Sequence, residues 1–441
     1  MAENKQAGIL EKTFKLSENN TDVKTELIAG LTTFMTMAYI VVVNPGILSS
    51  AGMPFEGVFI ATIAGIILGT LCMAVLTNYP FALASGMGLN AFFASVATSY
   101  GIGWQVVLGI VFIEGIIFMI LSATKLRETI VNAIPMSLKT GISAGIGLFI
   151  AFIGFQNAEI IVEYENILVT MGDLFSGEAL VAVVGLAVAA ILYARKVRGA
   201  LLIGIIVATL FGFVNGVTSP PEGIFAMPSM NDWSGVLLEL QVREVFQVGM
   251  IAIVISFLFV DLFDTAGTLV GVSQQAGYLD ENGDLPKASR ALMADAIGTT
   301  GGALFGTSTV TTYIESASGV AEGGRTGLTG VFVSCLFFLT LFFRPLVEMV
   351  PDAATAPALI LVGAFMMTNI SKIDWDDFTE VMPAFLTIII MPLAYSISDG
   401  IAIGFITYPL LKLFTGRKDE VHWLVYVLGA LFIAYFLWFK I

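Results

Sequence analysis

The sequence is poor in charged residues and has almost no histidine or cysteine. Only 12% of its 441 residues are charged, whereas 57% are hydrophobic. Soluble domains carry about 25% charged residues, so a soluble globular protein is excluded. The single histidine, His422, leaves no basis for a histidine-based metal site or a Ser-His-Asp triad within an apolar segment, and we expect it in a solvated loop. Cys72 and Cys335 lie far apart in apolar segments, and we interpret both as packing residues.

The N-terminal residues also lack the features of a signal peptide. Residues 1–26 are polar and contain neither a short apolar core nor a cleavage site, so we expect a cytoplasmic tail. The net charge of −14 says little about partners, because orientation depends on where the basic residues lie. Basic and acidic loops alternate, which predicts an N-terminus on the cytoplasmic side. The basic loops contain Lys125, Arg127 and Lys139, then Arg195, Lys196 and Arg198, then Arg417 and Lys418. Arg344 is an exception, because it is a basic residue on a predicted outer loop.

Apolar runs of transmembrane length recur from residue 27 to residue 440, which predicts an all-α polytopic membrane protein. The third segment of each half is short and rich in helix breakers. Matching short, glycine-interrupted segments in two halves indicate the binding site of a transporter. The predicted segments are 27–47, 58–77, 87–98, 103–122, 141–156, 180–194 and 200–216, then 246–270, 288–304, 310–320, 327–343, 355–369, 381–397 and 400–415.

A faint sequence echo relates the two halves. Gly69-Thr-Leu-Cys-Met-Ala74 aligns with Gly298-Thr-Thr-Gly-Gly-Ala303, and this register places Gly86 opposite Glu315. Seven segments is an odd number, so the second half enters the membrane from the opposite side and the repeat is predicted to be inverted. Residues 421–440 have no counterpart. They are either a fifteenth segment or a sign that residues 381–415 are divided wrongly.

Asp261 and Asp264 lie within a long apolar run, Val-Ile-Ser-Phe-Leu-Phe-Val-Asp-Leu-Phe-Asp-Thr-Ala-Gly-Thr-Leu. A carboxylate at bilayer depth costs roughly 2.5 kcal/mol or more, so such residues persist where they face a cavity, a substrate or an ion pathway. Their spacing places them on roughly one face of a helix. Either residue is a candidate for substrate contact or proton carriage, and Thr268 supplies a nearby hydroxyl. The alternative is a structural role in capping or in bonding between helices, which applies more strongly to Asp261.

Glu315 follows a run rich in hydroxyl groups, Gly306-Thr-Ser-Thr-Val-Thr-Thr-Tyr-Ile-Glu315, and precedes Ser-Ala-Ser-Gly. Such a backbone is typical of an interrupted helix that lines a binding site. Each hydroxyl taken singly, Thr309 included, is explained by a bond to a backbone carbonyl. The glutamate is harder to explain structurally. Its carboxylate accepts two hydrogen bonds side by side, a geometry that fits the paired N–H donors of a planar heterocycle.

The corresponding stretch of the first half is Ser85-Gly-Met-Gly-Leu-Asn-Ala-Phe-Phe93. Its Gly-x-Gly is not a nucleotide fingerprint, because no βαβ context surrounds it. A break at Gly86 leaves free N–H groups at a helix N-terminus, which favours acceptor atoms of a ligand. Asn90 either reaches the site, caps the helix or bonds between helices. Phe93 either stacks on an aromatic ring or packs in the core. A further acid, Asp295, we expect in a cap or a loop.

These motifs resemble the AzgA-like guanine/hypoxanthine/adenine permeases, a branch of the nucleobase transporters. The matching stretches are Asn44-Pro-Gly-Ile-Leu, Ala84-Ser-Gly-Met-Gly-Leu-Asn-Ala-Phe-Phe93, Val260-Asp-Leu-Phe-Asp-Thr-Ala-Gly-Thr-Leu269, Gly306–Gly319 and Glu322-Gly-Gly-Arg-Thr-Gly-Leu-Thr329. By position, Asp264 corresponds to the acid of the family's eighth element and Glu315 to that of the tenth. The uracil/xanthine pattern of Asn-x-Gly after the tenth-element acid is replaced here by Ser-Ala-Ser, which favours the purine branch.

The resemblance implies a 7+7 inverted repeat with a core domain and a gate domain, and short strands before broken helices 3 and 10. We divide the chain accordingly into a tail (1–26), a core (27–123 and 246–344), a gate (124–217 and 345–441) and an extracellular loop (218–245). It also implies a proton as coupling ion, no other cofactor, a purine base as substrate and no nucleic-acid partner. A homodimer through the gate domains is suggested by analogy.

The sequence therefore predicts a multi-pass plasma-membrane symporter that imports purine bases with an elevator-type movement of the core. Asp264, Glu315, Ser85, Gly86, Asn90, Phe93, Thr309 and Thr268 are the expected substrate-binding residues. The coupled proton is assigned to Asp264, Glu315 or Asp261. The alternatives are an anion transporter of the same architecture, disfavoured by uncompensated acids, a multi-span enzyme, for which no catalytic constellation is visible, and a passive channel.

Overall fold

The computed structural model describes residues 9–124, 133–165, 168–221, 223–246, 250–280 and 285–439. Within these residues the chain is mainly helical, and eight helical stretches are long and apolar enough to cross a membrane. Two loop charges used to predict orientation, Lys125 and Arg127, lie outside the described residues. His422 lies exposed in the turn before the last helix, as predicted. Cys335 is exposed on its helix, so the prediction of a packing residue is wrong there.

The first half follows the predicted segments closely, with one break and one addition. The first segment is divided at Tyr39 into two helices, and a two-stranded hairpin (β2–β3) that the sequence analysis missed precedes α9. The elements are α1 (Ile9–Phe14), α2 (Val23–Met37), α3 (Ile40–Ser49), α4 (Phe55–Thr77), β1 (Leu83–Ser85), α5 (Met87–Ser99), α6 (Trp104–Ala123), α8 (Met136–Asn157), β2 (Ile161–Tyr164), β3 (Leu168–Met171), α9 (Gly177–Ala194) and α10 (Ala200–Val214).

The second half repeats this order after the connecting elements α11 (Met230–Ser234) and η1 (Glu244–Phe246). It ends with one additional helix, α20, so residues 421–440 are not a misdivision of the preceding segments. The elements are α12 (Met250–Ala276), α13 (Ala288–Phe305), β4 (Val310–Thr312), α14 (Ser316–Ala321), α15 (Gly327–Thr340), η2 (Leu341–Phe343), α16 (Arg344–Glu348), α17 (Asp352–Met367), η3 (Thr368–Lys372), α18 (Phe378–Leu393), α19 (Ile397–Phe414), η4 (Lys418–Glu420) and α20 (Trp423–Phe439).

The two short strands pair with each other across the halves. β1 and β4 are antiparallel, with Leu83 opposite Thr312 and Ser85 opposite Val310. The helix before each strand ends in a left-handed residue, Asn78 (φ 61°) after α4 and Gly306 (φ 100°) after α13. This conformation is open to asparagine and glycine, so the same local device ends both helices and releases an extended segment.

A threonine on the preceding helix anchors each strand. The Thr70 hydroxyl receives the Leu83 N–H at 3.0 Å and donates to the Leu83 carbonyl at 3.2 Å. Thr299 makes the same two contacts with Val310, at 3.3 and 3.0 Å. These threonines belong to the Gly-Thr pairs of the sequence echo, and the two glycines also meet, because a Cβ on Gly298 would lie 3.2 Å from the Gly69 Cα. The echo therefore reflects structural equivalence.

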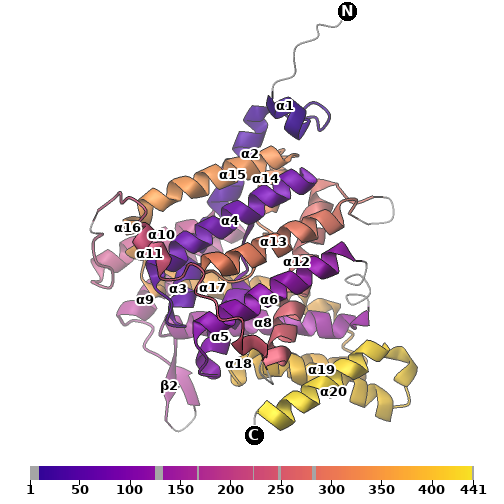
Figure 1. Ribbon diagram of the computed structural model, residues 1–441. Helices are drawn as coiled ribbons and strands as arrows, with labels where there is room; N and C mark the ends of the chain where they lie inside the picture. Colours follow the sequence, from indigo (N-terminus) through magenta and orange to yellow (C-terminus); the bar gives the residue numbers. More distant parts are fainter. Residues whose placement is uncertain are drawn as a thin grey trace, which may run out of the picture.

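The helices around the strand pair form one packed row. In Figure 1, α15, α4, α13 and α6 lie side by side, and α4 packs on both α13 and α15 while α13 packs on α6. α6 of the first half corresponds to α15 of the second, and α4 corresponds to α13. The α6–α13 contact is therefore the counterpart of the α15–α4 contact, as expected for a repeat. Close approach depends on small residues. A Cβ on Gly115 would lie 2.4 Å from Thr300 Oγ1, and one on Gly301 would lie 2.1 Å from Leu68.

The remaining helices form a second group around α8 and α17, the fifth helices of the two halves. These two helices cross at Gly147 and Gly363, where a Cβ on either glycine would lie within 2.6 Å of the carbonyl oxygen of the other. α9 and α10 pack beside α17, and α18 and α19 pack beside α8. α20 packs on the outside of α19.

A charged cluster fixes the end of the second group. Lys412, fully buried near the end of α19, lies 2.7 Å from Glu380, 2.8 Å from Glu420 and 3.6 Å from Asp377. Arg417 pairs with Asp377 and Glu420. Because Glu380 also accepts a bond from Ser137 of α8, the cluster joins α8, α18, α19 and η4.

Candidate substrate-binding site

The candidate site lies where the strand pair ends and two helices begin. Gly86 is the N-cap of α5 and Glu315 is the N-cap of α14, so the register predicted from the sequence echo matches the two helix starts. The Gly86 N–H donates to the Thr309 carbonyl at 3.0 Å, and the Tyr313 N–H donates to the Ala82 carbonyl at 3.0 Å. These bonds extend the strand pairing to the N-cap of α5 and to Tyr313, two residues before the N-cap of α14, so both helices start close to the strand pair.

Asp264 approaches this junction from α12. A Cβ on Gly86 would lie 3.4 Å from Asp264 Oδ2 and 3.2 Å from Thr311 Oγ1, and the Asp264 carboxyl bonds to the Thr311 hydroxyl. The side chain is only partly buried. Thr268, one turn further, is also partly exposed, and its hydroxyl donates within the helix to the Asp264 carbonyl at 2.9 Å. Glycine at position 86 therefore leaves room for the carboxylate beside a helix N-terminus.

Glu315 presents the second carboxylate. Tyr39, at the break between α2 and α3, donates a hydrogen bond of 2.6 Å to Glu315 Oε1. The side chain of Glu315 is partly exposed, and its neighbour Ile314 is 51% exposed. Ile314 also contacts α12, because a Cβ on Gly271 would lie 3.5 Å from its Cδ1. An accessible acid next to an accessible apolar side chain, on a break inside an apolar helix bundle, is the composition expected of a small-molecule site.

Other predicted residues form the support behind the strands. Asn44 donates to Thr62 at 2.7 Å, to Thr307 at 2.9 Å and to Ser85 at 3.3 Å. The hydroxyl of Ser85 is therefore committed to this network, and its carbonyl accepts from Tyr313 at 2.6 Å. Asn90 is fully buried and bonds to Ser308. The side chains of Ser85 and Asn90 thus support the strand pair, and the Asn90 N–H donates to the Gly86 carbonyl within α5 at 2.8 Å.

The aromatic residues of this stretch are buried as well. Phe93 is fully buried in the main core, and Phe92 stacks on Phe257 of α12 with ring centroids 4.2 Å apart. Asp295 lies two turns inside α13 and accepts a bond of 2.9 Å from Thr312. The prediction of a cap or loop role for Asp295 is therefore wrong. It supports β4 from the helix that precedes it.

Asp261 and Asp264 occupy different environments despite their spacing. Asp261 is fully buried, receives a bond of 3.0 Å from Thr265, and faces Glu114 of α6. Glu114 in turn accepts a bond of 3.0 Å from Thr309. Neither Glu114 nor Tyr39 is among the site residues predicted from the sequence. Glu114 carried a usable signal, since it is an acid in the middle of the apolar run Ile-Val-Phe-Ile-Glu-Gly-Ile-Ile-Phe.

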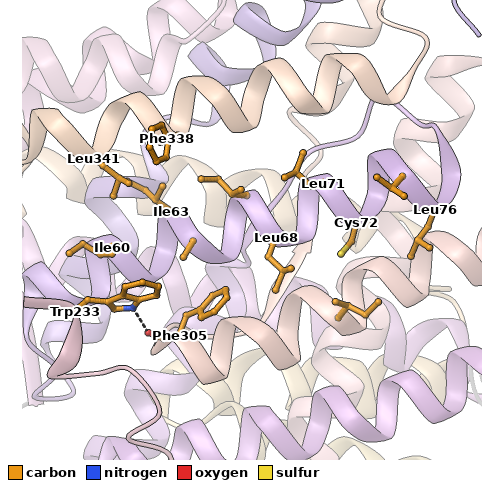
Figure 2. A pocket seen from close by; sticks show the side chains of 14 residues that line it. Ile60, Ile63, Leu68, Leu71, Cys72, Leu76, Trp233, Phe305, Phe338 and Leu341 are labelled. Carbon is orange, nitrogen blue, oxygen red and sulfur yellow. Dashed lines mark hydrogen bonds between the residues drawn. The ribbon is translucent and has the colours of Figure 1, made fainter. Parts of the chain in front are cut away.

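Two hollows in the structure lie away from Asp264 and Glu315. Figure 2 shows a groove of about 600 Å³ between α4, α13 and α15, lined by Ile60, Leu68, Leu71, Phe338 and other apolar side chains. The indole of Trp233 at its end is committed to the Phe305 carbonyl at 2.9 Å. This lining offers no polar group to orient a ligand. A second cleft, of about 710 Å³, lies between α3 and α5 on one side and α8 and α17 on the other, with Ser95, Asn157 and Asp352 in its walls.

Two partly exposed carboxylates beside the starts of two short helices, in a bundle of two related halves, define a membrane transporter of the 7+7 class. The solved structures with this fold include the transmembrane domain of the cyanobacterial bicarbonate transporter BicA (TM-score 0.61, 14% identity, 86% of this chain and 97% of that one). Another is SLC26A9 (TM-score 0.62, 13% identity, 93% of this chain and 70% of that one). The predicted fold is thereby confirmed.

The chain belongs to the permease family Xan_ur_permease. The model of this family matches residues 24–403. A permease of Methanocaldococcus jannaschii is 53% identical over 97% of this chain and 98% of its own length. The guanine/hypoxanthine permease PbuO of Bacillus subtilis is 47% identical over 95% and 98%. The adenine permease AdeQ of Escherichia coli is 44% identical over 97% and 96%. The resemblance to nucleobase permeases is confirmed, and the protein is a multi-pass membrane permease.

Proposed function

We propose that this protein imports purine nucleobases across the plasma membrane by proton symport. The observation that carries the proposal is the position of Asp264 and Glu315, two accessible carboxylates at one strand crossing inside an apolar bundle. A purine base is a flat ring whose edge combines N–H donors with carbonyl or ring-nitrogen acceptors. Carboxylates accept the donors, and the N–H groups that follow Gly86 at the start of α5 suit the acceptors. The names of the relatives PbuO and AdeQ agree with this substrate class.

We base proton coupling on the free-energy cost of placing the same two carboxylates at membrane depth. A carboxylate at membrane depth is unfavourable without compensation, so proton binding eases passage of the site through the apolar phase. Asp264, Glu315 or Asp261 carries the proton in this scheme. The site moves with the core (27–123 and 246–344) past the gate (124–217 and 345–441), with the N-terminus in the cytoplasm. An anion is disfavoured as substrate, because both accessible side chains at the crossing carry the wrong charge.

The test is uptake of radiolabelled hypoxanthine into cells that lack their own purine carriers. We expect saturable uptake, competition by unlabelled guanine or adenine, and collapse of accumulation when a protonophore is added. A sodium-free buffer is the control for sodium coupling. Absence of uptake for every purine tested would overturn the substrate assignment. Purine uptake that is unchanged by the protonophore would agree with the substrate assignment but would overturn proton symport.

A further inference from the structure

Two carboxyl groups meet in the interior, behind the strand crossing. Glu114 on α6 and Asp261 on α12 are both 0% exposed, and their carboxyl groups are hydrogen-bonded to each other. One oxygen of each group receives a threonine hydroxyl, from Thr309 to Glu114 Oε2 and from Thr265 to Asp261 Oδ1, both at 3.0 Å. The other oxygens, Glu114 Oε1 and Asp261 Oδ2, are buried as well.

A bonded pair of carboxyl groups requires one proton. An ionised carboxylate is only an acceptor, so a hydrogen bond between two carboxyl groups requires that one of them be protonated. Two adjacent ionised carboxylates in a buried site repel each other and lose the bond. The pair therefore has two distinct states, a protonated one in which the groups are bonded and a deprotonated one in which they separate.

Titratable groups lie on the elements packed against both α6 and α12. Among the described residues, the elements packed on α6 are α5, α12, α13 and η1. They contribute Asp264 and Asp295, which bond to Thr311 and Thr312 of β4, and two groups at helix ends, Arg290, which is exposed, and Glu244, which is partly exposed. α12 also packs on α8, α14, α19 and α20, which carry Lys139, Glu315 (at the N-cap of α14), Asp399, Tyr408, Lys412, Tyr426 and Tyr435. The acids dominate this part of the core.

Thr309 connects the pair to the substrate site. Its hydroxyl donates to Glu114, while its carbonyl accepts the Gly86 N–H at 3.0 Å. Gly86 is the N-cap of α5 and lies against Asp264 Oδ2. A change in the position of Glu114 is thus passed through one residue to the helix start that faces the substrate carboxylate.

We propose that Glu114 and Asp261 together hold the coupled proton, and that Thr309 links its presence to the geometry of the binding site. A proton taken from the outer solution converts two carboxylates into the bonded pair. Release of the proton to the cytoplasmic solution restores the two charges. The separating carboxylates then shift Thr309, and with it the Gly86 N–H that donates to the Thr309 carbonyl. Asp264 and Glu315 then act as the substrate-binding acids. This inference rests on the proposed function, and it adds Glu114 to the proton site.

The test compares Glu114→Gln with wild type in proteoliposomes. Glutamine keeps the size and the bonds to Thr309 and Asp261 but carries no exchangeable charge. We expect hypoxanthine exchange between the two sides to persist, while accumulation driven by a pH gradient is lost. One proton per substrate supports about tenfold accumulation for each pH unit of gradient, so the variant should fall to equilibration. Substrate-induced proton uptake, followed by a trapped pH dye, should disappear with it.

Two further variants separate coupling from folding. Glu114→Asp keeps an acid and should restore part of the accumulation. Asp295→Asn, an acid-to-amide change in the same core with its own bond to β4, should retain gradient-driven accumulation. Wild-type-like accumulation by Glu114→Gln would overturn the inference while purine transport itself stands. Wild-type transport that ignores the pH gradient would also overturn it. Absence of any purine transport by wild type would instead overturn the proposed function.

Discussion

Tyr39 donates a hydrogen bond of 2.6 Å to Glu315, so the break in the first transmembrane segment positions the carboxylate on the break of the tenth. The phenol is buried, and removing its hydroxyl leaves one oxygen of the acid without this donor. The bond therefore orients the acid toward its partly exposed side.

We predict that Tyr39→Phe weakens substrate binding. A hydrogen bond to a charged group contributes roughly 1.5–3 kcal/mol, so KM should rise by about tenfold or more while the maximal rate changes less. Initial rates of hypoxanthine uptake over a range of concentrations provide the measurement. Tyr100→Phe is the matched control, because Tyr100 bonds to Tyr435, away from the crossing. An unchanged KM in Tyr39→Phe would show that the bond does not orient the acid.

Asp264→Asn and Glu315→Gln should each abolish uptake. Each replacement keeps the side-chain volume but removes a carboxylate that accepts substrate N–H groups. A lost charge-assisted bond with an unpaired buried partner costs about 1–3 kcal/mol or more, which predicts at least about a fivefold fall in binding. Binding of purines to the purified variants, followed by ligand-induced thermal stabilisation, checks this without requiring transport. Normal uptake by both variants would remove the site assignment.

Glu26 should be essential for stability and indifferent to substrate. Its buried carboxylate receives the N–H groups of Arg325, Thr326 and Thr329 and the Thr329 hydroxyl at 2.5–3.3 Å, which caps the start of α15. Loss of these bonds in Glu26→Ala should cost about 2 kcal/mol or more. Thermal unfolding in detergent measures the effect, and Glu56→Gln, on the exposed first turn of α4, is the control. Equal melting temperatures for the two variants would contradict the capping role.

The charged cluster at the end of α19 should make stability sensitive to acid. Bonds from Thr379 and Arg417 hold the pKa of Asp377 well below its usual value. Arg417, followed by Lys412, lowers the pKa of Glu420 to about 2. Lowered folded-state pKa values stabilise the fold above the unfolded values near 4. This contribution is lost as the pH falls from there toward about 2. Arg417→Gln should be less stable at neutral pH and lose less on acidification; parallel pH profiles would contradict this.

Much of the fold could be predicted because the length and apolar composition of membrane helices identify them in a sequence. The predicted segments 58–77 and 103–122 correspond to Phe55–Thr77 and Trp104–Ala123. The break at Tyr39 was not predictable, because no glycine or proline marks it. The β2–β3 hairpin was missed because its strands are four residues each and lie between hydrophobic helices that dominate the pattern.

The site was predictable only as far as its acids. Asp264 and Glu315 stand out because a carboxylate in an apolar run needs an explanation. Side-chain direction does not follow from spacing, so Ser85, Asn90 and Phe93 were assigned to the substrate although their side chains face the interior. Glu114 is also an acid in an apolar run, but its pairing with Asp261, on a helix from the other half of the chain, could not be predicted. Pairings of that kind are set by tertiary packing.

The pairing of β1 with β4 also constrains biosynthesis. When the ribosome has delivered the first half to the membrane, β1 has been made and its partner has not. The Leu83 N–H and C=O groups bond to Thr70 of the same half, but the groups of β1 that bond to β4 then lie at membrane depth without a partner, at a cost of several kcal/mol for each unsatisfied group. The nascent first half is thus an obligate intermediate that must be shielded until β4 arrives. Neither half of the gene, expressed alone, should yield a stable protein.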